Sequence, residues 1–279
     1  MRKHLQRLGT DTAIYGVGTI VGRFLNFLLV PLYTNILLPA DLGIVSYMYS
    51  MIAFANVLYA YGMESAYFRY SASLEIGTQK QNFSAPFFSL LSTSVMFSFM
   101  ILILQHPLTS VLSLPRDYTP VVAYAAGIMA LDAIAIIPFA VLRMERNAKT
   151  FAFIKILNIV VNVVLNIVFL VVLRTGVVGI FVSGLIASAV TIIFLLPTIV
   201  RNVSWKIDGS LLTALLKFAL PYIPAGLATQ AIQVIDRPIM RALTNDATVG
   251  IYQANYRLGI FMMLIVQMFD FAWRPFYFS

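Results

Sequence analysis

The sequence predicts an all-α fold, a polytopic membrane helix bundle of about eight transmembrane helices. Of its 279 residues, 60% are hydrophobic and only 11% are charged, and the mean hydropathy is +0.88. Soluble domains contain about 25% charged and 45–50% apolar residues, so this chain lacks the polar surface that water requires. Its apolar residues also occur in stretches of roughly 20, the length that spans a bilayer. These observations exclude a soluble globular domain, a disordered segment and a nucleic-acid-binding arm.

Turn-forming residues separate the predicted spans. The first span follows a basic N-terminal segment and ends before the Pro-containing turn 38–41, and the polar turn 77–80 follows the second. Segments 114–117, 174–176 and 208–209 contain Pro or Gly beside polar residues and separate later spans. The predicted spans are residues 12–34, 42–67, 84–105, 119–142, 151–173, 176–200, 212–236 and 249–273.

The distribution of cations predicts the orientation. Counted from a cytoplasmic N-terminus, thirteen of the 19 Lys and Arg residues fall on the cytoplasmic side of the predicted spans. Four fall on the opposite side, and Arg23 and Arg257 lie within spans. Cytoplasmic loops of membrane proteins carry an excess of Lys and Arg. We therefore expect a multi-pass protein with both ends of this chain in the cytoplasm.

An internal repeat relates the last two predicted spans to the first two. Apolar segments resemble one another easily, so an accidental match is the alternative. If the repeat is real, one unit has six spans, and the two units are related by an axis along the membrane normal. A shift of 207 residues aligns Tyr15 with Tyr222, Pro31 with Pro238, Gly43 with Gly250, Ile44 with Ile251 and Tyr49 with Tyr256.

The repeat predicts two domains. Residues 1–206 would form a complete N-terminal six-helix lobe, and residues 207–279 would form the first two helices of a second, incomplete lobe. Either the chain is a fragment or an ancestral second half was cut. The abrupt apolar end at Ser279 favours a fragment.

Polar side chains inside the spans are candidate binding groups, because in hydrocarbon they are costly and face a bundle interior or a wet cavity. The first span carries polar residues on one helical face between positions 15 and 26, and the seventh carries a comparable stripe. Two repeat-related polar stripes are what a central pathway between two lobes needs. For Arg23, the alternative is a structural ion pair. The candidate substrate-binding residues are Arg23, Asn26, Gln230, Gln233, Arg237 and Arg257.

Carboxylates within or near spans are candidates for ion coupling. These are Asp132, Glu64 and Asp270. Asp132 is the best placed, inside the fourth span, whereas the others lie near span ends, where a hydrated structural carboxylate is common. The fifth span carries a further polar stripe, which interhelical hydrogen bonding explains well. Its members are Lys155, Asn158, Asn162 and Asn166.

Catalytic motifs are absent from the sequence. It contains no Cys, its two His residues lie far apart, and it has neither a P-loop nor a GxGxxG segment. We therefore expect no enzyme activity, no cofactor, no metal site and no nucleic-acid partner. Without a nucleotide site, any energy for transport must come from an ion gradient or from the substrate's own gradient.

Three segments carry a family resemblance. Residues 28–34, Leu-Leu-Val-Pro-Leu-Tyr-Thr, and 37–43, Leu-Leu-Pro-Ala-Asp-Leu-Gly, resemble the opening of bacterial polysaccharide-biosynthesis membrane proteins. These are the Wzx-type O-antigen and capsule flippases of the multidrug/oligosaccharidyl-lipid/polysaccharide (MOP) exporter superfamily. Residues 138–146 and the following span are similar to that family's fourth-to-fifth span junction, and residues 270–275 to the end of its eighth span. The patterns are loose, but they extend over the whole chain.

The resemblance implies a MATE/MOP-like transporter of two six-span lobes in the bacterial inner membrane. Such a protein flips an undecaprenyl-pyrophosphate-linked oligosaccharide, the repeat unit of O-antigen lipopolysaccharide, capsule or exopolysaccharide, by alternating access. The implied partners are this substrate, membrane lipid, a coupling proton or sodium ion, and polysaccharide-assembly proteins. Family members are thought to bind pyrophosphate or acidic sugars through cavity cations, a role that Arg23 matches here.

Two other interpretations stay open. The first is a cation-coupled multidrug antiporter of the same superfamily, which favours an acidic cavity. The second is a non-transporting membrane scaffold for polysaccharide synthesis.

Overall fold

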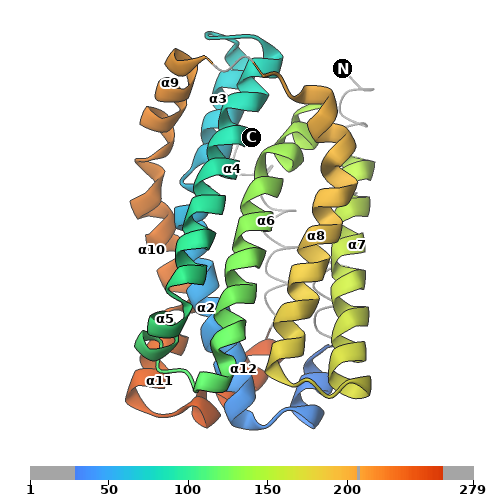
Figure 1. Cartoon of the computed structure of the whole chain (residues 1–279), viewed down its shortest axis with the longest axis vertical. Coiled ribbons are helices and arrows are strands. Elements are labelled where there is room, and N and C mark those ends of the chain that lie inside the picture. Colours follow the sequence, from blue (N-terminus) through green and yellow to red (C-terminus); the bar gives the residue numbers. More distant parts are fainter. Residues whose placement is uncertain (1–28, 206–207, 260–279) are drawn as a thin grey trace, which may run out of the picture.

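A computed structural model describes residues 29–205 and 208–259, and these residues form a helical bundle without strands (Figure 1). Arg23, Asn26 and Asp270 lie outside the described residues. The first described residues, 29–36, are helical. The helices that follow are α2 (Pro39–Ala60), α3 (Met63–Ser73), α4 (Gln79–Ile103), α5 (Gln105–Val111), η1 (Arg116–Tyr118), α6 (Thr119–Met144), α7 (Ala148–Ile167), η2 (Val168–Val172), α8 (Val177–Asn202), α9 (Gly209–Ala219), α10 (Tyr222–Val234), α11 (Asp236–Leu243) and α12 (Asp246–Leu258).

Five of the predicted spans are confirmed among the described residues. Five helical stretches are long and apolar enough to cross a membrane: Pro39–Ser73, Gln79–Ile103, Arg116–Met144, Ala148–Val172 and Val177–Asn202. A sixth is present if α9 and α10, which meet at a bend of 41°, form one broken span. The predicted first span and the end of the eighth fall largely outside the described residues.

Local sequence explains where several helices begin. The hydroxyl of Thr78 accepts a hydrogen bond from the backbone N–H of Gln81, and the Gln81 side chain accepts one from the backbone N–H of Thr78. This reciprocal capping box satisfies two backbone donors that the first turn of a helix leaves free. It starts α4 five residues before the predicted span. Asn147 caps α7 and Asn245 caps α12, each through a side-chain oxygen that accepts from the backbone N–H three residues later.

The predicted second span is broken into α2 and α3. Tyr61 and Gly62 between them have φ angles of 30° and 73°, which lie in the left-handed region. Gly62 also lies against α9, since a Cβ atom there would be 2.6 Å from the backbone oxygen of Ala219. A residue without a side chain allows both the turn and this close approach. Two short helices, α5 and α11, lack the length to span and were not predicted.

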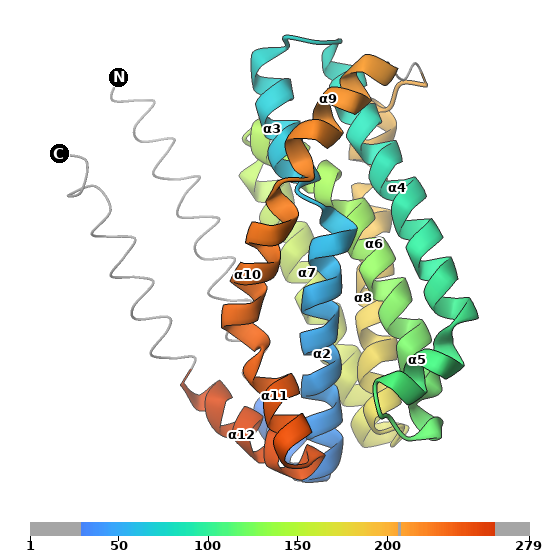
Figure 2. The same ribbon diagram turned by 90° about the vertical axis from the view of Figure 1, so that its left-hand side faces the viewer.

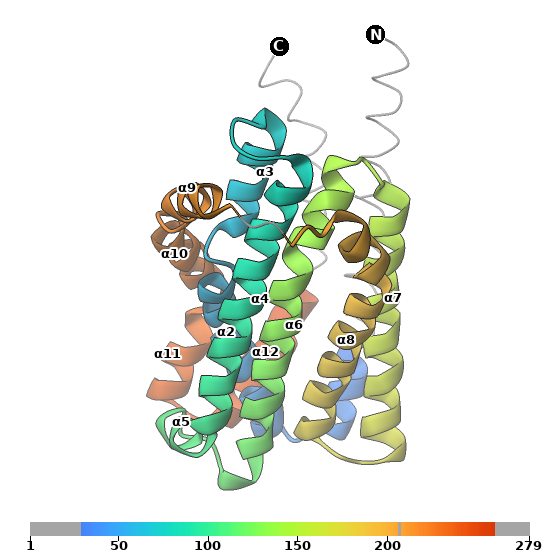
Figure 3. The ribbon, with the colours of Figure 1, turned by 45° about the horizontal axis from the view of Figure 1, so that its top comes forward.

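Two apolar cores are stacked along the bundle, and α6 belongs to both. One contains residues of α2 with the first halves of α6 and α8, and the other contains residues of α3, α4 and α9 with the second half of α6. Figure 3 shows α7 and α8 beside α6, with α9 and α10 on the opposite flank. In Figure 2, α10 lies alongside α2 and α12 meets the start of α2. Polar residues gather where α6, α7 and α8 adjoin.

Candidate functional site

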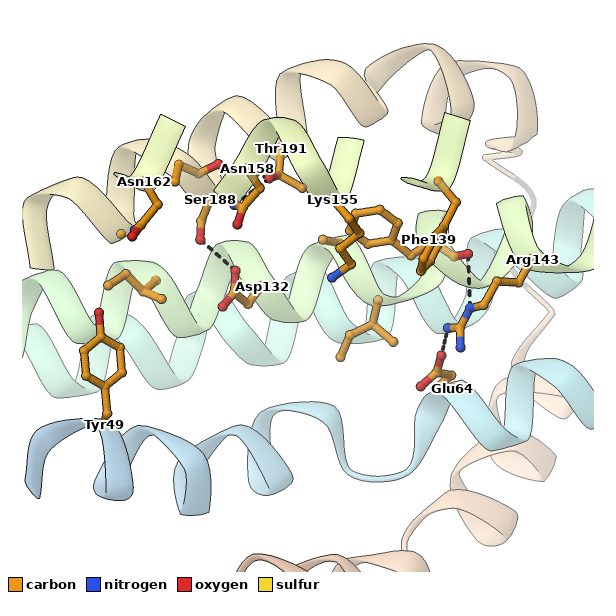
Figure 4. Close-up of a pocket in the computed structure, with 16 residues that line it drawn as sticks. Tyr49, Glu64, Asp132, Phe139, Arg143, Lys155, Asn158, Asn162, Ser188 and Thr191 are labelled. Atoms are coloured by element: carbon orange, nitrogen blue, oxygen red, sulfur yellow. Dashed lines mark hydrogen bonds and ion pairs between the residues drawn. The ribbon is translucent and has the colours of Figure 1, made fainter. Parts of the chain in front are cut away.

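A cavity of about 510 Å³ lies within the bundle, between α2, α3, α6, α7 and α8 (Figure 4). Its wall combines amide and hydroxyl side chains with aromatic rings, apolar side chains and four charged groups. The polar and aromatic lining residues are Tyr49, Phe139, Phe151, Asn158, Asn162, Ser188 and Thr191. The charged ones are Glu64, Asp132, Arg143 and Lys155.

Asp132 of α6 faces the cavity, and a residue of α8 donates a hydrogen bond to it. The hydroxyl of Ser188 donates a hydrogen bond of 2.7 Å to its carboxylate. Ser188 itself is buried, whereas Asp132 is exposed to the cavity. The carboxylate therefore keeps room to accept further donors or a cation. The structure thus places this candidate on the cavity wall, and its ion-coupling role stays a prediction.

The residues of the polar stripe on α7 have two environments: some line the cavity, and one is buried between helices. Asn158 donates a hydrogen bond of 2.9 Å to the hydroxyl of Thr191 on α8, the type of interhelical bond that its spacing predicts. Asn166, one turn beyond Asn162, is completely buried. It donates to the Asn162 side chain at 3.0 Å and accepts a bond of 2.9 Å from Tyr33. Asn166 thus joins α7 to residues 29–36, while Lys155, Asn158 and Asn162 line the cavity.

Lys155 is a charged cavity residue that the sequence placed in a polar stripe but not among the candidate binding residues. Its ammonium nitrogen lies 4.3 Å from the centre of the Phe139 ring. We counted it among the cations that set orientation, because it falls near the start of a predicted span. In the structure it is on the face of α7 that looks into the cavity (Figure 4). Its spacing of three residues from Asn158 placed it in that stripe, for which the sequence favoured interhelical hydrogen bonding.

An ion pair between Glu64 of α3 and Arg143 of α6 lies at one end of the cavity. The guanidinium group also donates to the backbone oxygen of Phe139 at 3.5 Å and lies over the rings of Phe68 and Phe151, at 5.1 and 5.8 Å. Both charged side chains are more than a third exposed. Glu64, a predicted ion-coupling carboxylate, is therefore already paired with a cation.

The remaining described candidates, Gln230, Gln233, Arg237 and Arg257, lie elsewhere than on this cavity wall. Arg237 is 6% exposed and donates to Gln253 at 3.1 Å, to Asp236 at 2.7 Å and to the backbone oxygen of Gln233 at 2.6 Å. The guanidinium group of Arg257 lies 5.4 Å from the centre of the Tyr33 ring. A substrate contact by these four residues stays a prediction.

Helical spans around an internal polar cavity define a multi-span membrane protein, and solved structures share its fold. The multidrug transporter DinF-BH of the MATE type matches with a TM-score of 0.73 and 18% identity, over 93% of this chain and 61% of that one. An inward-facing multidrug resistance MATE transporter of the MOP superfamily gives 0.61 and 20%, over 86% and 58%. The Vibrio cholerae MATE transporter VcmN in its bent form gives 0.57 and 16%, over 94% and 62%.

The family follows from the sequence itself. A model of polysaccharide biosynthesis proteins matches residues 33–272, so the chain belongs to this family, as its segments predict. No curated protein sequence matches the chain. The chain covers about three fifths of the length of the solved transporters, 61% for DinF-BH.

Proposed function

We propose that this chain is part of a transporter that moves a lipid-linked oligosaccharide across the bacterial inner membrane. It would supply an N-terminal six-helix lobe, residues 1–206, and the first two helices of a second lobe, with its N-terminus in the cytoplasm. Membership of the polysaccharide biosynthesis family and a MATE-type fold support the proposal. The observation that carries it is the cavity among the spans, whose wall includes amide, hydroxyl, aromatic and charged side chains beside apolar ones.

The wall suits a sugar better than an apolar compound. Sugar hydroxyls exchange hydrogen bonds with amide and hydroxyl side chains, which Asn158, Asn162 and Thr191 supply here. The C–H faces of a sugar ring pack on aromatic rings such as Tyr49 and Phe151. We propose that the glycan headgroup enters the cavity while the lipid tail stays in the bilayer, and that the lobes rock in alternating access.

The remaining sequence candidates keep their proposed roles. Arg23, Asn26, Gln230, Gln233, Arg237 and Arg257 would contact substrate between the lobes. Asp132, Glu64 and Asp270 would bind the coupling proton or sodium ion, with Asp132 first because it faces the cavity beside Ser188.

Multidrug antiport is the second candidate, because the solved transporters of this fold are described as multidrug transporters. An organic cation needs acidic groups free to receive it. In this cavity Glu64 is paired with Arg143, and Asp132 shares the wall with Lys155. The lining therefore holds as many cations as carboxylates, which favours the glycan.

Transport assays on the full-length protein in liposomes test the proposal. The substrates are an undecaprenyl-pyrophosphate-linked oligosaccharide and an organic cation dye, each measured separately. Ser188→Trp fills the cavity from α8, and Ile193→Trp on the same helix is the control, because Ile193 is 59% exposed and outside the cavity lining.

We expect oligosaccharide transport that Ser188→Trp abolishes and Ile193→Trp preserves. Dye transport with the same dependence would overturn the proposal in favour of the antiporter. Transport of neither substrate by correctly inserted protein would overturn it in favour of the scaffold.

A further inference from the structure

The positive charge of Lys155 has no matched acceptor among the described residues. Of the four charged groups on the cavity wall, Glu64 and Arg143 form an ion pair, and Asp132 accepts a hydrogen bond from Ser188. For the ammonium group of Lys155, the described residues provide the ring face of Phe139 at 4.3 Å but neither a hydrogen-bond acceptor nor an ion pair. The side chain projects into the cavity in Figure 4.

A cation between membrane helices is costly unless an opposite charge or acceptor meets it. An ammonium group has three N–H donors, and the face of an aromatic ring satisfies none of them as a carboxylate or phosphate does. Asp132 is a carboxylate on the same cavity wall, on α6 where Lys155 is on α7. Among the described residues, the cavity lining holds two cations and two carboxylates, whose formal charges balance.

A second set of donors lies farther along the same helix face. The Asn162 side-chain oxygen accepts from Asn166, while its amide N–H₂ group has no acceptor among the described residues. Asn162 is seven residues beyond Lys155, a separation of about 10 Å along α7. A ligand that meets both therefore carries an anionic group and, about 10 Å away, a neutral hydrogen-bonding group.

We propose that Lys155 is the anion-binding group of this cavity and binds a phosphate or carboxylate group of the ligand. The carboxylate of Asp132 competes with that anion for the ammonium group of Lys155. Asn162 contacts the ligand's hydroxyl groups two turns away. This inference deepens the proposed function, on which it rests for the choice of a charged glycan as ligand. It assigns the two charged residues opposite effects on anion affinity.

The competition predicts that the two charges change anion affinity in opposite directions, which can be measured. Removing the Lys155 charge removes the attraction for the anion, whereas removing the Asp132 charge removes the competitor and leaves Lys155 free. A purely structural role for both residues predicts weaker binding, or none, from either change. Opposite signs therefore distinguish a binding role from a loss of folding.

Isothermal titration calorimetry on the purified full chain in detergent tests this. The probes are inorganic pyrophosphate, a glucuronate-containing oligosaccharide and a neutral oligosaccharide of the same length; the first two separate the phosphate source from the carboxylate source. The variants are Lys155→Gln, Lys155→Arg and Asp132→Asn. Lys149→Gln is the control, a cation on the same helix that does not line the cavity.

We expect Lys155→Gln to weaken binding of at least one anionic probe by about tenfold or more, the usual effect of losing a charged hydrogen bond. Lys155→Arg keeps most of the affinity, Asp132→Asn raises it, and Lys149→Gln leaves it unchanged. Anion affinity unaltered by Lys155→Gln, or lowered equally by Lys149→Gln, would overturn the proposal, as would wild-type protein that binds neither anion. Anion binding with these signs in a protein that transports no oligosaccharide would support the anion site and contradict the proposed function.

Discussion

Gly43 of α2 and Gly250 of α12 pack reciprocally against each other's helices. A Cβ atom on Gly43 would overlap the backbone oxygen of Asp246, and one on Gly250 would overlap the backbone oxygen of Pro39. The repeat shift of 207 residues takes Pro39 to Asp246 and Gly43 to Gly250. The repeat shift therefore maps one side of this contact onto the other, as expected for two helices related by a local two-fold axis. This symmetry supports the repeat.

Substitution of either glycine is expected to force α2 and α12 apart. Gly43→Ala and Gly250→Ala each place a methyl group on backbone rather than on a movable side chain, so the cost reaches about 1–3 kcal/mol or more. Gly209→Ala is the control, because nothing lies within 4 Å of a Cβ atom there. Thermal unfolding of purified protein measures the effect. Equal unfolding midpoints for all three variants would contradict the close crossing.

Arg241 of α11 joins the start of α12 to the turn that follows α5. It donates to the backbone oxygens of Leu112 and Ser113 at 2.7 and 3.0 Å and to the carboxylate of Asp246 at 2.5 Å. A lysine keeps the charge but lacks the fork that reaches all three acceptors. We expect Arg241→Lys to cost about 1.5–3 kcal/mol of unfolding free energy. Arg116→Lys, at an exposed position of η1, serves as the control and is expected to change little.

The asparagines of α7 are expected to separate into a packing residue and a cavity residue. Asn166→Leu leaves the buried Tyr33 hydroxyl without its acceptor, so it should destabilise the protein by about 1–3 kcal/mol. Asn158→Leu should cost less, because one interhelical bond in a membrane protein averages about 0.6 kcal/mol. Adding Tyr33→Phe to Asn166→Leu should recover part of the loss. Unfolding measurements showing no such recovery would exclude this hydrogen bond as the cause.

The ion pair of Glu64 and Arg143 is expected to contribute little to stability, since both side chains are more than a third exposed. Glu64→Arg alone places two cations together and should weaken transport. The exchanged pair, Glu64→Arg with Arg143→Glu, should restore transport toward the wild-type rate in the liposome assay. If the exchanged protein were no better than the single variant, the pairing would have no functional role.

Hydropathy predicted the spans because crossing a bilayer imposes a length and a composition on each helix. Five described spans lie near their predicted positions, with α4 lengthened by the Thr78 cap. The break at Gly62 and the short helix α11 were not foreseen. Both depend on contacts made in three dimensions, such as the approach of Gly62 to Ala219.

The site was only partly predictable. Asp132 stood out as an acid inside a span, and it lies on the cavity wall. Lys155 did not stand out, because spacing shows which residues share a helix face but not whether that face lines a cavity or packs against another helix. Arg237 donates a hydrogen bond to Gln253, sixteen residues later, a contact that spacing does not predict, and its substrate role stays a prediction. The expected pathway between two lobes stays a prediction. The cavity that the structure describes is formed by helices of residues 39–202.

Cysteine protection tests the central claim, that the glycan occupies this cavity, most directly. The chain contains no Cys, so Asn162→Cys introduces a single thiol on the cavity wall, and Ser110→Cys introduces one at an exposed position of α5. The measurement is the labelling rate of each thiol by a maleimide, with and without lipid-linked oligosaccharide. The account predicts that the oligosaccharide slows labelling at position 162 and leaves position 110 unchanged. Equal labelling of Asn162→Cys with and without the oligosaccharide would contradict it.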